Sequence, residues 1–98
     1  MKRAEAMRRL KQSESELRRL GVERLFLFGS TARDEAGKNS DVDLFFDHEP
    51  GKLGLFELIG VQQRVAEILG EPADVMTRDS LHPLLRKRIE ETAVAVFS

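Results

Sequence analysis

The sequence predicts an α/β (α+β) fold in which a small mixed β-sheet is flanked by helices. Segments with helical periodicity alternate with short apolar segments of strand length, in the order α-β-α-β-α-β-α-β. Apolar residues make up 41% of the chain and charged residues 34%, as in globular proteins. Because 98 residues suffice for one hydrophobic core and not for two, we expect residues 1–98 to form a single domain.

The first helix is expected over residues 2–20, with Gly21 ending it as a C-cap residue. Its apolar positions recur at helical spacing: Met7, Leu10, Leu17 and Leu20. Seven basic and three acidic residues lie between Lys2 and Arg19, so the helix is basic. A solvated helix surface explains this charge, and contact with nucleic acid is an alternative that we do not favour.

A strand is expected over residues 24–28, where a nearly continuous apolar run is typical of burial on both faces. Gly29 ends this strand. Ser30 or Thr31 is expected to N-cap a short helix that extends to about Glu35.

The second strand is expected over residues 42–46, after a turn at residues 37–40. Because alternate residues of a strand point to the same face, Asp41, Asp43 and Phe45 should share one face. The other face should hold apolar side chains, namely Val42, Leu44 and Phe46.

The second half of the chain predicts two helices and two strands. A helix is expected over residues 55–69, ended by Gly70, and a strand over residues 73–76. Pro83 suits the first turn of a helix that runs to about residue 92, before a last strand at residues 93–97. Several phenylalanines are expected in the core rather than against a ligand: Phe26, Phe28, Phe45, Phe46 and Phe56.

Three aspartates on the predicted strands indicate a metal site. One aspartate at the start of a strand is commonly a turn or edge residue, but Asp41 and Asp43 would repel each other unless a cation lies between them. Asp74 interrupts an otherwise apolar strand, where an unpaired carboxylate is unfavourable. Such oxygen ligands suit Mg²⁺ or Mn²⁺, and a Gly29-Ser30 turn nearby offers backbone N–H groups to a phosphate.

Two segments, 28–33 and 40–44, resemble the signature of the DNA polymerase β-like nucleotidyltransferases. They read Phe-Gly-Ser-Thr-Ala-Arg and Ser-Asp-Val-Asp-Leu, and ten residues separate Ser30 from Asp41. The Gly-Ser-x-Ala-Arg form and the short chain resemble the minimal nucleotidyltransferase (MNT) subgroup in particular. The resemblance extends over nearly the whole chain, including Pro-Ala-Asp-Val-Met-Thr around Asp74. It implies the minimal polymerase β-like nucleotidyltransferase fold.

The resemblance also implies roles for individual residues. Gly29 and Ser30 would bind the triphosphate of ATP, and Asp41 and Asp43 would hold two Mg²⁺ ions, with Mn²⁺ as an alternative. Asp74 would hold the second ion and help to deprotonate the acceptor hydroxyl. Attack on the α-phosphate would then transfer AMP and release pyrophosphate.

The role of Arg33 stays open at this point. As a nucleotide-binding residue it would contact a phosphate, but it could equally pair with Asp34 or Asp47. Lys38 is expected to be solvated on the turn, and Ser40 to shape that turn.

The acceptor follows from the resemblance alone. Members of the MNT subgroup are commonly paired with a HEPN-domain ribonuclease toxin, which they inactivate as antitoxins by transferring AMP to one of its tyrosines. The resemblance therefore implies a HEPN toxin partner in a hetero-oligomer. The alternatives are nucleotidyl transfer to RNA or to a small molecule, and a non-catalytic antitoxin that acts by contact.

Two apolar stripes are candidates for partner docking, although packing in the core would explain most of these residues. One stripe holds Met7, Leu10 and Leu17, and the other holds Leu84, Leu85 and Ile89. The chain has no cysteine, no apolar run near the ~18 residues of a membrane span and no apolar signal core. These features favour a cytoplasmic protein that has no membrane partner.

Overall fold

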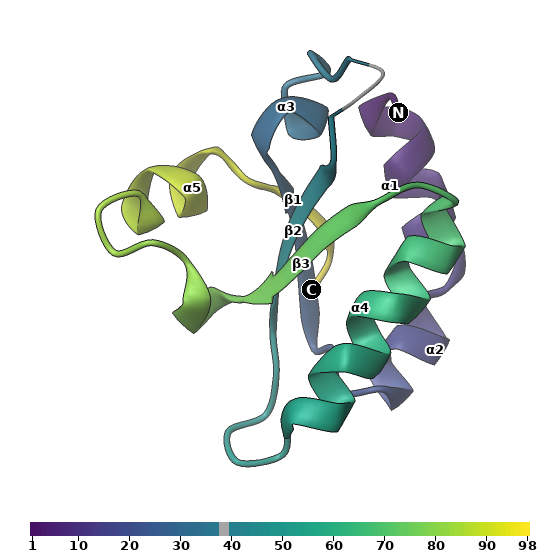
Figure 1. The fold of residues 1–98 in the computed structure, drawn as a ribbon, viewed down its shortest axis with the longest axis vertical. Helices are drawn as coiled ribbons and strands as arrows, with labels where there is room; N and C mark the ends of the chain where they lie inside the picture. Colours follow the sequence, from purple (N-terminus) through teal and green to yellow (C-terminus); the bar gives the residue numbers. More distant parts are fainter. Residues whose placement is uncertain (38–39) are drawn as a thin grey trace.

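The computed structural model describes residues 1–37 and 40–98, and its centre is a four-stranded mixed sheet (Figure 1). The strands are β1 (Arg24–Phe28), β2 (Val42–Asp47), β3 (Ala73–Thr77) and β4 (Val94–Phe97). They lie in the order β3-β2-β1-β4. Strand β1 is antiparallel to β2 and to β4, whereas β2 is parallel to β3. The expected mixed sheet flanked by helices is confirmed.

Most of the helices lie on one side of this sheet. The helices are α1 (Arg3–Gln12), α2 (Glu14–Arg19), α3 (Gly29–Ala32), α4 (Leu55–Leu69) and α5 (Arg86–Thr92), with a short 3₁₀ helix η1 (Arg78–Ser80). Figure 1 shows α1, α2 and α4 together beside the sheet, α5 on the other side and α3 at one end. Among the described residues, no helix has the length and apolar character needed to cross a membrane.

The hydrophobic core fills the space between the sheet and the layer of α1, α2 and α4. Alternate strand residues point into it, and all are fully buried or nearly so: Leu25, Leu27, Val42, Leu44, Phe46 and Val75. The helices contribute Leu10, Leu17, Val61, Val65 and Leu69, which are 0% exposed. The expected alternation in β2 is confirmed, because period 2 in the strand matches the one-sided cover of the sheet.

The opposite face of the sheet is only partly covered. The rings of Phe26 and Phe45 stack with their centroids 4.8 Å apart, and the Arg78 guanidinium lies 5.1 Å from each centroid. Phe45 is buried, but Phe26 and Phe28 are half-exposed. The expectation that residues 24–28 are buried on both faces was therefore wrong, since no complete layer of helices packs on this side.

Two predicted helices have different limits in the structure. The helix expected over residues 2–20 is divided at Ser13, whose backbone (φ −104°, ψ 14°) separates α1 from α2. The helix expected from Pro83 starts only at Arg86, because a turn precedes it in which the N–H groups of Leu85 and Arg86 both donate to the carbonyl of His82 at 2.9 Å.

The apolar stripes divide between core and surface. Leu10 and Leu17 are core residues, whereas Leu84 is 88% exposed and Leu85 is 53% exposed. Phe56, expected in the core, is 85% exposed, because it lies in the first turn of α4 away from the buried stripe of that helix.

Candidate active site at one end of the sheet

The register of the sheet brings the predicted aspartates together. Asp43 of β2 pairs with Phe28 at the end of β1 on one side and with Asp74 of β3 on the other. Asp41 directly precedes β2, two residues before Asp43, so both belong to the same face of the chain. Asp41, Asp43 and Asp74 thus lie at the end of the sheet where β1 runs into α3.

Gly29 lies directly against one of these carboxylates. Its backbone has φ +75°, in the left-handed region, and a Cβ atom placed there would collide with Oδ2 of Asp43. A residue with a side chain would therefore be strained by conformation and by contact. The close approach of the Gly29 backbone to Asp43 places the Gly-Ser turn beside the aspartates.

The short helix at this turn is smaller than expected. Helix α3 begins at Gly29 itself and ends at Ala32, and within the described part of the chain no side chain caps its N-terminus. The expectation that Ser30 or Thr31 is the N-cap was therefore wrong, as was the extension to Glu35. Phe28 occupies the capping position through its extended backbone, and the Glu35 N–H donates to the Ser30 carbonyl at 2.8 Å.

Asp43 is affected electrostatically by the two carboxylates near it. Burial raises the pKa of Asp43, and the negative charges of Asp74 and Asp41 raise the pKa further, whereas the Arg33 guanidinium lowers it. Asp41 and Asp74 are exposed, and Asp43 is half-buried. Ionised Asp43 is thus destabilised in the free protein, and a bound cation would relieve this repulsion.

The donor set fits a hydrated divalent cation. Across residues 1–37 and 40–98, no three Asp, Glu or His side chains form a ready-made cation cage. Mg²⁺, however, usually keeps several of its waters and is bound by one or two carboxylates together with substrate phosphates. The mutual repulsion of Asp41, Asp43 and Asp74 and their oxygen chemistry are what such an ion requires.

Arg33 lies near the aspartates but has another partner. Its Nε donates to Glu35 Oε2 at 3.1 Å, and both side chains are exposed. The alternative of pairing with Asp34 or Asp47 was wrong, since Asp47 is occupied by Arg24 and Arg78. The Arg33 guanidinium lowers the pKa of Asp43, so Arg33 is close enough to act electrostatically on an anion bound at this site.

The turn between α3 and β2 is described only in part. The Gly37 N–H donates to Ser40 Oγ at 3.2 Å, so Ser40 shapes the turn as expected. Lys38, for which a solvated position was expected, lies outside the described residues.

Two further features at this end of the sheet were not predicted from the sequence. Thr31 is fully buried, and its Oγ1 has no hydrogen-bond partner among the described residues. Arg3 contacts the C-terminal end of α3 and the turn behind it, through bonds to Ala32 and Asp34 respectively. No sequence signal indicated Arg3, because the contact joins residues about 30 positions apart.

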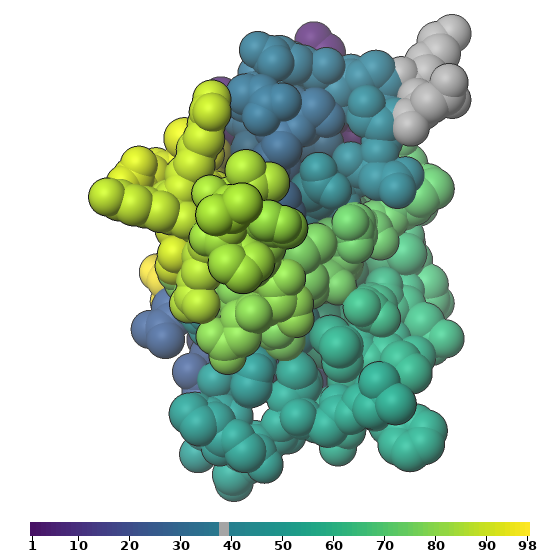
Figure 2. Space-filling model, turned by 60° about the vertical axis from the view of Figure 1, so that its left-hand side comes forward, coloured from purple at the N-terminus to yellow at the C-terminus, as the bar shows by residue number. Residues whose placement is uncertain are grey.

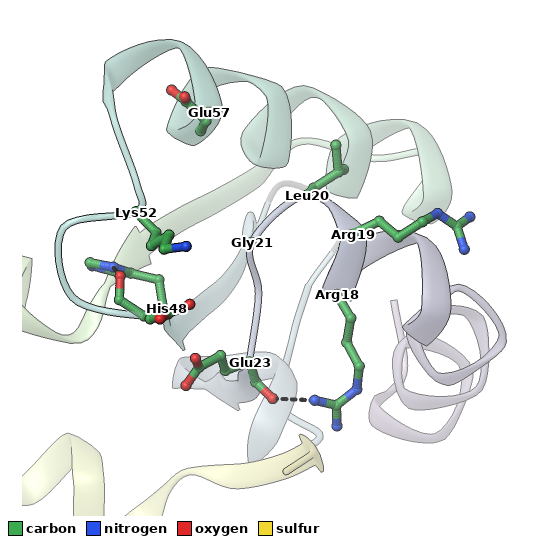
Figure 3. A pocket seen from close by; sticks show the side chains of 9 residues that line it. Arg18, Arg19, Leu20, Gly21, Glu23, His48, Lys52 and Glu57 are labelled. Carbon is green, nitrogen blue, oxygen red and sulfur yellow. Dashed lines mark hydrogen bonds between the residues drawn. The ribbon is translucent and has the colours of Figure 1, made fainter.

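Two hollows on the surface lie away from the aspartates, near the C-terminal end of β2. The larger has a volume of about 320 Å³ (Figure 3). Its charged lining is balanced, with Arg18, Arg19 and Lys52 against Glu23, Glu49 and Glu57. Arg18 is already bound to the Glu23 carbonyl at 2.8 Å. This hollow therefore does not favour binding of a triphosphate. We place the candidate site at Asp41, Asp43 and Asp74 because of their chemistry, although the hollow is larger.

Comparison with known proteins agrees with this fold. The family profile described as nucleotidyltransferase domain matches residues 7–96. A Methanocaldococcus jannaschii protein, provisionally named a protein adenylyltransferase, is 42% identical over 77 residues, which are 79% of this chain and 82% of the relative. The protein adenylyltransferase MntA of Thermococcus cleftensis is 33% identical over 84 residues, or 85% of this chain and 84% of the relative.

Solved structures share the fold. A structure described provisionally as a minimal nucleotidyltransferase is 30% identical, has a TM-score of 0.82 and is matched over 96% of this chain and 95% of its own. A crystal structure described as a toxin-antitoxin with AMP-PNP has a TM-score of 0.70 at 19% identity, over 90% of this chain and 73% of its own, and shows likeness of fold. Fold and relatives together define an enzyme that transfers nucleotides. The chain belongs to the nucleotidyltransferase domain family, as one of its minimal members.

Proposed function

We propose that this chain is a metal-dependent protein adenylyltransferase, which moves AMP from ATP to a hydroxyl group of a partner protein and releases pyrophosphate. One observation carries the proposal: the Gly29 backbone lies against the Asp43 carboxylate, which is in register with Asp74. A phosphate-binding turn beside a set of repelling carboxylates suits chemistry on a nucleoside triphosphate. On this view residues 1–98 act as one nucleotidyltransferase domain, in line with the family match over residues 7–96.

The proposal divides the three aspartates into two roles. Asp41 and Asp43 would hold two Mg²⁺ ions, or Mn²⁺ ions, and Asp74 would help to hold the second. When bound, such ions stabilise negative charge on phosphate oxygens as Lewis acids. The exposed Asp74 carboxylate accepts the proton of the acceptor hydroxyl. The hydroxyl oxygen forms a bond to the α-phosphorus, and the bond from that phosphorus to the bridging oxygen breaks, so that pyrophosphate leaves with the electron pair.

The Gly-Ser turn binds the departing phosphates. Gly29 lets the backbone approach them closely, and the Ser30 hydroxyl donates to a phosphate oxygen. Arg33 also binds a phosphate. Its guanidinium gives up the exposed salt bridge with Glu35, because a phosphate is a stronger bidentate partner.

We propose a HEPN-domain ribonuclease toxin as the partner and a tyrosine hydroxyl as the acceptor, so that the chain acts as an antitoxin in a hetero-oligomer. The names of the relatives support a protein acceptor, and the toxin-antitoxin structures share this fold. The segment leading into α5 supplies an exposed apolar surface of Leu84 and Leu85. In Figure 2 this yellow-green segment projects next to the blue atoms of the α3 segment, so a partner docked there would lie close to the site.

The test is intact-mass spectrometry of a HEPN-domain protein from the same organism after mixing with this chain and Mg-ATP. We expect a mass gain of one AMP unit or a small multiple, on a tyrosine. Leu84→Asp should reduce the gain, whereas Phe56→Asp, at a comparably exposed position on α4, should not. If the Asp41→Asn, Asp43→Asn double variant neutralises the toxin with no added mass, neutralisation by contact is the correct function instead.

A further inference from the structure

We infer that Arg3 is a positioning residue, which fastens the N-terminal helix to the phosphate-binding turn and holds that turn against Asp43. The inference rests on the proposed function for its effect on ATP. Two bonds define the contact: the Arg3 backbone N–H donates to Asp34 Oδ1 at 3.0 Å, and Arg3 Nη1 donates to the Ala32 carbonyl at 3.0 Å. The family match begins at residue 7, so Arg3 lies outside the part of the chain that it covers.

Helix α3 needs such support because it is a single turn of four residues. The last carbonyls of a helix lack partners within it, and a cation at this end interacts favourably with the helix dipole. The guanidinium of Arg3 bonds the carbonyl of Ala32, which is the last residue of α3. Arg3 therefore caps the C-terminal end of the helix that begins at Gly29.

The second bond holds the residue where the chain leaves α3. Asp34 has φ +59°, a left-handed conformation that is uncommon for residues other than glycine, and its N–H donates to the Thr31 carbonyl at 3.0 Å. Its side chain accepts from the Arg3 backbone. The bond to Arg3 thus stabilises the tight turn directly behind α3.

Movement at this end of α3 would reach the aspartates. The Arg33 N–H donates to the Gly29 carbonyl at 3.2 Å, which ties the end of the turn to its beginning. Gly29 in turn lies against the Asp43 carboxylate. A four-residue helix spans only ~6 Å, so displacement of its C-terminal end also shifts the backbone proposed to bind phosphate.

Neighbouring arginines of α1 show that this contact is particular to Arg3. Arg8 bonds Glu5 within the same helix, at Nε to Oε2, 3.2 Å, and is exposed. Its removal therefore changes the charge of α1 by the same amount without touching α3. Arg8→Gln is the matched control for Arg3→Gln.

The experiment uses the full chain and two measurements. The first is hydrogen exchange at the amides of Arg33 and Glu35, without nucleotide, which reports the turn itself. We expect Arg3→Gln to speed exchange there by about tenfold to a hundredfold, the effect of losing one hydrogen bond from a charged donor, and Arg8→Gln to leave it unchanged. Asp34→Gly should act in the same direction, whereas Asp34→Asn, which keeps the acceptor oxygen, should not.

The second measurement is AMP transfer at varied ATP concentration. Arg3→Gln should raise KM for ATP by several-fold with a smaller change in kcat, while its thermal midpoint matches that of Arg8→Gln. Unchanged exchange, or unchanged KM with faster exchange, would overturn the inference. If the wild-type chain transfers no AMP while Arg3→Gln speeds exchange, the fastening of the turn stands and the proposed function fails.

Discussion

Gly29 is the residue at which backbone conformation and site chemistry meet. Its φ of +75° alone favours glycine, and the Asp43 carboxylate fills the space that a Cβ atom would need. The first effect is backbone strain and the second is contact with the site. Gly51 is a control for the first effect alone, because its φ is +77° while no described atom lies within 4 Å of its Cβ position.

We expect Gly51→Ala to destabilise the fold by about 1–2 kcal/mol, as for a left-handed L-residue, and to leave transfer intact. Gly29→Ala should be more destabilising by about another 1–3 kcal/mol, because the methyl group also displaces Asp43, and should abolish transfer. Urea unfolding and an AMP-transfer assay measure both. Equal effects of the two substitutions would mean that Gly29 serves only the backbone.

Residues close in sequence could be predicted, and those that depend on distant partners could not. The positions of Asp41 and Asp43 follow from strand period and their distance from Ser30. The partner of Arg33 does not, because several carboxylates lie within reach of a long side chain and only the fold selects Glu35. Arg3 was missed for the same reason.

At the scale of elements, the parallel pairing of β2 with β3 determines which residues lie together at the candidate site. A crossover through α4 returns the chain in the same direction and places Asp74 opposite Asp43. The exposed position of Asp74 on the edge strand fits contact with an acceptor more than with the nucleotide.

Asp74→Asn should therefore separate binding from transfer. We expect Mg-ATP to bind through Asp41, Asp43 and the Gly29 turn with an affinity within a few-fold of wild type, while AMP transfer is lost. Calorimetry and a transfer assay with ATP labelled at the α-phosphate distinguish the two steps. Complete loss of nucleotide binding would show instead that Asp74 is a primary ligand or a structural residue.

A second cluster joins β2 to the segment that carries α5. Asp47 accepts from Arg78 Nε at 2.7 Å and from Arg24 Nε at 3.0 Å, and Arg78 also pairs with Glu90 of α5. The hydrogen bond from Arg78 holds the pKa of Asp47 below its ordinary value of 3.8, and Arg24 lowers it further. The stabilisation from ionised Asp47 is present above that ordinary value and is lost as pH falls through the lower pKa of the folded state.

Asp47→Asn should therefore reduce the free energy of unfolding at pH 7 by about 1–2 kcal/mol, since the side chain is mostly buried. The difference from wild type should shrink as pH falls below the ordinary value of 3.8 and disappear below the lower pKa of the folded state, where the wild-type carboxyl is neutral as well. Urea unfolding at several pH values measures it. A difference that stays constant down to the acid limit would show that charge is not its cause.

Strand limits were predictable to within a residue, because apolar runs and turn residues mark them locally. The break at Ser13 was not, since helical periodicity continues on both sides of it. The late start of α5 was missed because Pro83 suits a first helical turn, whereas the chain forms a separate turn on the His82 carbonyl.

For the whole molecule, one layer of helices leaves the other face of the sheet partly open, with the aspartates at one end of it. The fold class could be predicted because element order and strand patterning suffice for a small mixed sheet. The exposure of three apolar residues could not be predicted, because Phe56 lies off the buried stripe of α4, while Leu84 and Leu85 belong to the turn before α5.

The most direct test of the central claim is Asp43→Asn, assayed by transfer of label from ATP labelled at the α-phosphate, with Mg²⁺ and the HEPN-domain partner present. Because burial and neighbouring charges raise the pKa of Asp43, its ionised form destabilises the metal-free fold at neutral pH. The variant should therefore be folded, and without metal at least as stable as wild type. We predict that its transfer rate falls at least about a thousandfold, as for a dismantled metal site. Transfer at a rate comparable to wild type would contradict the account.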